Sequence, residues 1–150
     1  MEKVSTILQE AQQRAQELKL PYKGALFPNE AYKILQSVPF TRLVDVRCRA
    51  ELDWVGRIPN SVEIEWATYP GMTANPQFMA QLEQQAAKET CLLFMCRSGA
   101  RSNAAATQAT QAGFANCYNV LEGFEGDKDT AQHRSTLNGW RAAGLPWIQS

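Results

Sequence analysis

A single cysteine loop carries most of the chemistry that this sequence can support. Cys96 follows an apolar run and precedes an alanine-rich stretch, in the segment FMCRSGARSNAAA at residues 94–106. Gly99 can adopt backbone angles that a side chain forbids, so the loop can curl around its first residue with its N–H groups pointing inward. Arg97 and Arg101 add positive charge, and the helix expected next adds its positive dipole end. The pattern predicts an anion site, filled by the Cys96 thiolate or by a bound oxyanion.

No other residue is an obvious partner for this thiol. The only histidine is His133, in a polar segment, and nothing in its spacing selects it as the base of a cysteine–histidine hydrolase. The four cysteines form no CxxC pair and show no other spacing typical of zinc. We therefore expect no metal and no structural disulfide.

Helix and strand patterns alternate along the chain. Residues 3–19 have apolar side chains at helical spacing, which predicts an amphipathic helix. Further helices are expected from near Asn29, from the capping pair Asn75–Pro76, over residues 102–113 and over residues 136–143. Strands are expected at RLVDV (42–46), SVEIEW (61–66), CLLFM (91–95) and CYNVL (117–121).

This alternation predicts an α/β fold in which helices flank a central, mainly parallel sheet on both faces. The segment 91–95 is apolar throughout, as expected of a central strand buried on both faces. Ligands of such sheets bind beyond the carboxyl ends of the strands. Cys96 comes directly after such an end, so we expect the site to lie there.

The composition argues against several functions. A chain of 150 residues suits a single globular domain. Fifteen basic residues balance fifteen acidic ones, so we expect no binding to nucleic acid. No apolar stretch approaches the ~18 residues of a membrane span, and we expect no membrane partner. The N-terminal segment contains Glu2 and Glu10 and lacks the apolar core of a signal peptide, which favours a cytoplasmic protein.

The CRSGAR loop, directly after a buried strand, resembles the active-site loop of rhodanese-like sulfurtransferases. The resemblance covers most of residues 27–147. LVDVRCRAEL resembles the family's Asp-Val-Arg strand, VGRIPNSVEIEW its Gly-His-Ile-Pro-Gly-Ala segment, and NVLEGF and GWRAAGLPW its C-terminal portion. The resemblance implies a rhodanese-like domain over residues 25–150, preceded by an amphipathic helix and connector over residues 1–24, in one globular unit.

The resemblance implies a sulfurtransferase. In that family the loop cysteine takes a sulfane sulfur from a donor such as thiosulfate, holds it as a persulfide and passes it to a thiophilic acceptor such as cyanide, a thiol or a protein. Cys96 would then be the sulfur carrier, and Asp45 and Arg47 would support the loop. No metal or organic cofactor is implied. The loop residues expected to bind the persulfide and the donor are Arg97, Ser98, Gly99, Ala100 and Arg101.

Two other functions stay open. Cysteine-dependent phosphatases, which arsenate reductases resemble in chemistry, use a Cys-x5-Arg loop. Here the sixth position after Cys96 is Ser102, and the arginine comes one residue earlier, at Arg101. The shorter loop makes a smaller cradle, which suits a sulfur atom better than a phosphate. The second alternative is a binding or regulatory module without catalysis, against which the intact loop argues.

Departures from the family pattern lie near the expected mouth of the site. Arg57 stands where the family often has histidine, Asn60 where it often has glycine, and a polar insertion covers residues 125–135. They leave the donor and the acceptor undetermined. The insertion and the helix at 3–19 are places where a protein partner could dock, or the helix packs on its own sheet.

Cys48 stands apart from the other two cysteines, Cys91 and Cys117. It follows the predicted strand at 42–46 and should therefore lie at the same sheet edge as Cys96. Its thiol is either a resolving or sulfur-accepting group or an inert, partly buried one.

Overall fold

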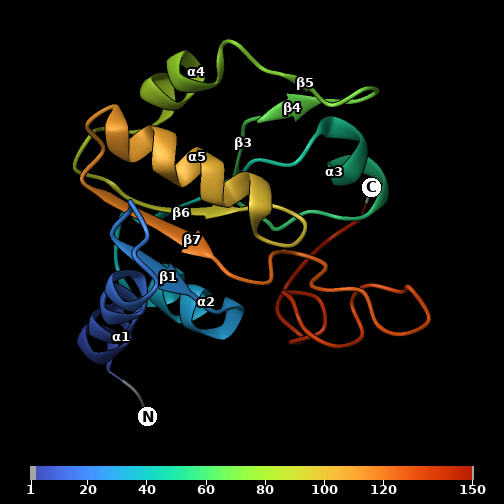
Figure 1. Ribbon diagram of the computed structural model, residues 1–150, viewed down its shortest axis with the longest axis horizontal. Helices are drawn as coiled ribbons and strands as arrows, with labels where there is room; N and C mark the ends of the chain where they lie inside the picture. Colours follow the sequence, from blue (N-terminus) through green and yellow to red (C-terminus); the bar gives the residue numbers. More distant parts are fainter. Residues whose placement is uncertain (1–2, 150) are drawn as a thin grey trace.

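Five parallel strands form the central sheet, in the order β1-β7-β6-β2-β3 (Figure 1). The computed structural model describes residues 3–149 of the chain. The strands are β1 (Gly24–Leu26), β2 (Arg42–Asp45), β3 (Val62–Glu63), β6 (Cys91–Met95) and β7 (Asn116–Val120). A separate antiparallel hairpin consists of β4 (Ala67–Thr68) and β5 (Thr73–Ala74).

Helices cover both faces of this sheet, as the sequence predicts. The helices are α1 (Val4–Glu17), α2 (Pro28–Ser37), α3 (Arg49–Trp54), α4 (Phe78–Gln85) and α5 (Ala100–Gln111). In Figure 1, α4 and α5 lie on one side of the sheet, and α1 and α2 lie on the other. The predicted α/β architecture is confirmed.

Side chains of the central strand β6 alternate between two hydrophobic cores. Leu92 and Phe94 pack with Leu82 of α4 and with the alanines of α5, and Cys96 belongs to the same core. Leu93 and Met95 belong to the opposite core. The alternation therefore sends the Cys96 side chain toward the helix that follows it.

The opposite core contains the buried face of the N-terminal helix. Ile7 and Ala11 of α1 are buried together with Leu26 of β1 and Ile34 of α2. The helix thus packs on the sheet of its own chain. Among residues 3–149, no helix is both long and apolar enough to cross a membrane.

The helix predicted over residues 136–143 is wrong, because this segment consists of turns. Trp140 N donates to Gly123 O (2.8 Å) and Arg141 N donates to Phe124 O (3.2 Å). The backbone thus bonds to the turn after β7, and within the segment a single helical bond forms, from Ala143 N to Gly139 O (3.0 Å). The fully buried Trp140 side chain anchors the segment in the core beneath α2.

Two other boundaries differ from the predicted ones. The side chain of Asn75 accepts a hydrogen bond from Gln77 N (3.0 Å), so it caps a turn, and α4 begins only at Phe78. The strand predicted at 61–66 is regular only at Val62–Glu63. Its extended path continues, since Trp66 N still donates to Val46 O (3.0 Å).

Candidate active site

The Cys96 sulfur accepts two hydrogen bonds from the start of α5. Gly99 N lies 3.1 Å and Ser102 Oγ lies 3.3 Å from Sγ. Gly99 precedes α5 with φ +111°, a backbone conformation that favours glycine and turns the chain back over the sulfur. Both donors, together with the helix N-terminus, stabilise negative charge on the sulfur.

Ser102 is a hydrogen-bond donor to the Cys96 sulfur that the sequence analysis did not identify. The sequence marks it only as the position where a phosphatase would have its arginine. In the structure its side chain is fully buried and its hydroxyl donates to Cys96 Sγ. The sequence did contain a signal, because Ser102 stands at helical spacing from Ala105, Ala106 and Ala109, and these four residues form the buried face of α5.

Arg97 and Arg101 lie on the same loop but have different surroundings. Arg101 binds Glu51 of α3 with two nitrogens, at 2.7 Å and 2.9 Å. Burial favours the neutral form of the Glu51 carboxyl, but Arg101 outweighs it and lowers the pKa of Glu51 to about 2. Arg97 is exposed to solvent. Of the two predicted anion-binding arginines, Arg101 is thus already paired with a carboxylate.

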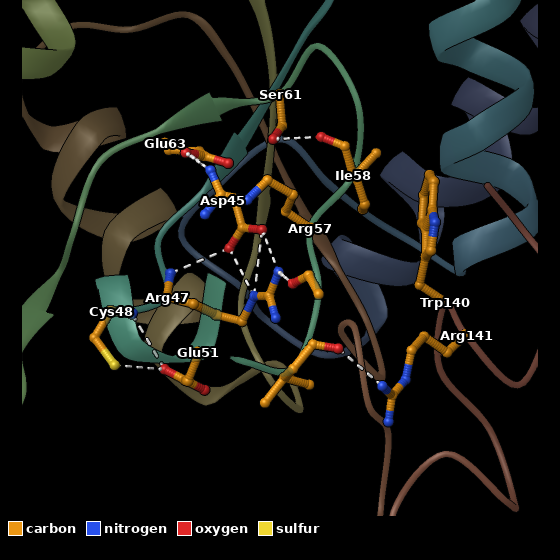
Figure 2. Close-up of polar contacts among 12 residues, drawn as sticks. Asp45, Arg47, Cys48, Glu51, Arg57, Ile58, Ser61, Glu63, Trp140 and Arg141 are labelled. Atoms are coloured by element: carbon orange, nitrogen blue, oxygen red, sulfur yellow. Dashed lines mark hydrogen bonds and ion pairs between the residues drawn. The ribbon is translucent and has the colours of Figure 1, made fainter. Parts of the chain in front are cut away.

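Cys48 lies at the predicted edge and is linked to the same carboxylate. It precedes α3, and its thiol donates to Glu51 Oε1 at 3.2 Å (Figure 2). Burial raises the pKa of the Cys48 thiol. Its neutral form is therefore favoured, which makes it a weak nucleophile compared with a thiolate.

Asp45 and Arg47 form a fully buried ion pair below the loop. Arg47 Nη2 lies 2.7 Å from Asp45 Oδ2 and 2.8 Å from Gly56 O. Figure 2 shows the two side chains of this pair facing each other. The guanidinium also lies 4.1 Å from the ring centre of Phe124. Phe124 N in turn donates to Cys96 O (2.8 Å). The pair therefore supports the cysteine loop through Phe124.

Further contacts fix the loop from the end of β7. Asn119, which is almost fully buried, donates to Gly99 O (3.3 Å). Glu125 N and Gly126 N both donate to Arg97 O, at 3.0 Å and 3.2 Å. Ser98 is half-buried and Ala100 is exposed, and they complete the turn between these anchored positions.

A cavity of about 510 Å³ opens beside the loop. Cys96 itself is only 1% exposed, and the cavity is lined by its loop neighbours Arg97 and Arg101 rather than by the sulfur. The residues that line the cavity are Cys48, Glu51, Val55, Tyr69, Met72, Arg97, Arg101, Glu125 and Arg134.

The remaining candidates lie apart from the sulfur. His133 is exposed, and its backbone N donates to Asp129 Oδ1. Arg57 forms ion pairs with Asp53 and Glu63 on the outer side of α3. Within the described residues 3–149, no group of three or more histidine, cysteine or acidic side chains could hold a metal ion.

The family model for the rhodanese-like domain matches residues 27–130, more than half of the chain. The chain belongs to the rhodanese-like domain family. The resemblance seen in the CRSGAR loop and its flanking segments is thereby confirmed. The matched range begins directly after β1 and ends within the insertion that follows β7.

Relatives of this rhodanese-like domain include proteins known from sequence and from structure. The protein RC0915 of Rickettsia conorii is 34% identical over 124 residues, which cover 79% of this chain and 91% of the relative. The crystal structure of Rv0390 from M. tuberculosis has 44% identity and a TM-score of 0.79, and the match covers 86% of this chain and 99% of that one. The polysulfide-sulfur transferase of Wolinella succinogenes shares the fold, with a TM-score of 0.59 at 23% identity over 94% of this chain and 87% of that one.

Proposed function

We propose that this rhodanese-like domain is a sulfurtransferase that carries a sulfane sulfur on Cys96 as a persulfide. The observation that carries the proposal is the placement of two hydrogen-bond donors, Gly99 N and Ser102 Oγ, on the Cys96 sulfur. A module that only binds a partner does not need a stabilised sulfur anion. The fold neighbour from Wolinella succinogenes bears the name of a sulfur transferase, which adds support.

The reaction has two displacement steps. The Cys96 thiolate attacks the outer sulfur of thiosulfate, the sulfur–sulfur bond breaks, and its electron pair leaves with sulfite. The product is an anionic persulfide on Cys96. A thiophilic acceptor then attacks the outer sulfur of this persulfide, which regenerates the thiolate. Cyanide as the acceptor gives thiocyanate, and a thiol or a protein thiol gives a new persulfide.

The surrounding residues have different parts in this mechanism. Gly99 N and Ser102 Oγ stabilise the thiolate before the attack and after the release. Arg97 is the loop arginine that faces solvent at the cavity, and it attracts the anionic donor. Arg101 acts as a positioning residue, because its ion pair with Glu51 fixes the first turn of α5 against α3.

The geometry does not favour phosphate chemistry. A phosphatase loop directs an arginine at the bound phosphate, but here Arg101 is bound at both terminal nitrogens by Glu51. The sixth position after the cysteine holds Ser102, whose hydroxyl donates to the sulfur. We expect no hydrolysis of an aryl phosphate under conditions in which sulfur transfer is measurable.

Mass spectrometry of the intact protein tests the proposal. After incubation with thiosulfate, the wild type should gain the mass of one sulfur atom, and cyanide should remove it. Cys96→Ser should gain none. Cys117→Ser is the matched control, because this buried cysteine lies at the other end of the sheet and should leave the gain unchanged. If neither thiosulfate nor an organic persulfide adds sulfur to the wild type, the function is that of a binding module.

A further inference from the structure

The polar insertion at residues 125–135 forms part of the cavity wall. It contributes Glu125 and Arg134 to the lining. Its far end is an ordered loop around Asp129, whose Oδ1 accepts hydrogen bonds from Ala131 N and His133 N, both at 2.9 Å. The insertion therefore presents its side chains from a fixed backbone.

Arg134 is held in a defined position relative to the cysteine loop. Its Nη1 donates to Gly126 O (2.6 Å), and Gly126 N donates to Arg97 O (3.2 Å). Ser135 N donates to Glu125 O (2.7 Å), which closes the insertion onto its own first residue. One short chain of hydrogen bonds thus connects Arg134 to the loop that contains Cys96.

The cavity carries an excess of positive charge. Its lining has three arginines and two glutamates, which leaves one positive charge uncompensated. Arg101 is neutralised by Glu51. Among residues 3–149, neither Arg97 nor Arg134 forms an ion pair with a carboxylate. These two guanidinium groups are free to bind an anionic group of a ligand.

The rest of the wall is apolar and the space is large. Val55 lies on one side, and Tyr69 and Met72 extend from the β4–β5 hairpin. Tyr69 and Met72 are 61% and 44% exposed, so they offer apolar surface that no part of the described chain covers. Cavities of about 300–1,000 Å³ hold organic ligands, and the 510 Å³ here far exceeds what an inorganic anion fills.

We propose that this cavity binds a low-molecular-weight organic persulfide with a carboxylate group. Arg134 and Arg97 hold the carboxylate, and Val55, Tyr69 and Met72 contact the carbon atoms. Arg134 is then a specificity-determining residue supplied by the insertion. This inference rests on the proposed sulfurtransferase function, and it names the class of donor.

The transfer from such a donor needs no further reactant. The Cys96 thiolate attacks the terminal sulfur of the persulfide R–S–SH, and the sulfur–sulfur bond breaks. Its electron pair leaves with the organic thiolate R–S⁻, while the proton stays on the transferred sulfur. The departing thiolate keeps its carboxylate and leaves from the same cavity.

A pair of donors that differ by one charge tests this assignment. The persulfide of N-acetylcysteine has a free carboxylate, and the persulfide of its methyl ester does not. We measure kcat/KM for sulfur transfer from each donor to cyanide. The wild type should prefer the carboxylate donor by about tenfold, since a hydrogen bond to a charged group contributes about 1.5 kcal/mol or more.

Substitutions in the insertion identify the responsible residue. Arg134→Gln should remove the preference, mainly through a higher KM for the carboxylate donor, and Arg134→Lys should restore part of it. Lys128→Gln is the matched control, because Lys128 is an exposed cation of the same insertion outside the cavity lining. Melting temperatures verify that all variants are folded.

The outcomes separate the two proposals. If Cys96 accepts sulfur from thiosulfate but the two organic donors react equally well, the assignment of Arg134 is wrong and the sulfurtransferase function stands. The same holds if Lys128→Gln removes the preference as fully as Arg134→Gln does. If no donor transfers sulfur to Cys96, both proposals fail.

Discussion

The hydroxyl of Ser102 is a side-chain donor placed directly on the sulfur of Cys96, the candidate sulfur carrier. It is fully buried, and its hydrogen bond to Cys96 Sγ comes from the first turn of α5. Gly99 N supplies the second bond from the backbone. Removal of the hydroxyl therefore leaves the sulfur with one of these two donors.

We expect Ser102→Ala to slow sulfur transfer about tenfold, because a hydrogen bond to a charged group contributes about 1.5 kcal/mol or more. Alkylation of Cys96 by iodoacetamide at neutral pH should slow in parallel, since the reagent reacts with the thiolate. Thr107→Ala is the control on the same helix, because its hydroxyl donates to Asn103 O and does not contact the sulfur. Alkylation at an unchanged rate would show that Ser102 has only a structural role.

The residues of the site were predictable to different degrees. Cys96 and its loop are local in sequence, so residue types and spacing were sufficient to propose them as the candidate site. The partner of Arg101 was not predictable, because Glu51 lies fifty residues earlier in the chain. The parallel pairing of β2 with β6, which α3 and α5 follow, brings the two together. Arg134 lies in a polar insertion whose fold depends on Asp129 and could not be inferred from periodicity.

At the scale of elements, the turn after β7 fits the cysteine loop closely. A Cβ atom added to Gly123 would lie 2.5 Å from Cys96 O and 2.6 Å from the backbone of Arg97, at a φ of +67°. Such distances require the backbone to move. The turn thus fixes the start of the cysteine loop through direct backbone contact.

We expect Gly123→Ala to destabilise the protein by more than the ~1–2 kcal/mol of left-handed backbone strain alone, and to reduce sulfur transfer strongly. Gly113→Ala separates the two effects. Gly113 also has a positive φ (+101°), but no atom lies within 4 Å of the added Cβ. This control should lose stability in urea unfolding and keep its activity. Full activity of folded Gly123→Ala would contradict the proposed role of the turn.

The helices and strands that the sequence predicted are those whose hydrophobic pattern is long enough to recognise. The strand at 91–95 appears at its predicted bounds, and the helix predicted at 102–113 is α5 (Ala100–Gln111). The three residues of β1 are too few to show a period. The six residues of α3 are similarly few, although Cys48 and Glu51 form a capping box at its start. The helix predicted at 136–143 is wrong because the amides of Trp140 and Arg141 bond to residues 123 and 124 instead of to the segment itself.

At the scale of the whole molecule, the ion pair between Glu51 and Arg101 couples stability to pH. The folded-state pKa of Glu51 is about 2, compared with an ordinary value of 4.5. A lowered pKa means that the folded state favours the charged form. The stabilisation is therefore fully present above about pH 4.5 and is lost as the pH falls toward about 2.

We expect the free energy of unfolding to fall more steeply between pH 4.5 and pH 2 in the wild type than in Glu51→Gln. Urea unfolding at a series of pH values measures the two slopes. Glu83→Gln removes a carboxylate from an exposed pair with Lys88 and should keep most of the wild-type slope. Equal slopes for the wild type and Glu51→Gln would show that the pair does not couple stability to pH.

The pairing of β1 with β7 also determines when the central sheet can be completed during synthesis. Gly24 pairs with Tyr118, so β1 leaves the ribosome roughly ninety residues before its only neighbour in the sheet. Pairings this distant in sequence cost entropy before their contacts compensate for it. The amides of Phe124 and Glu125 that anchor the cysteine loop are made later still. A nascent chain that ends before β7 therefore lacks the two amides that bond to Cys96 O and Arg97 O, and the cysteine loop is anchored only after the last strand has been made.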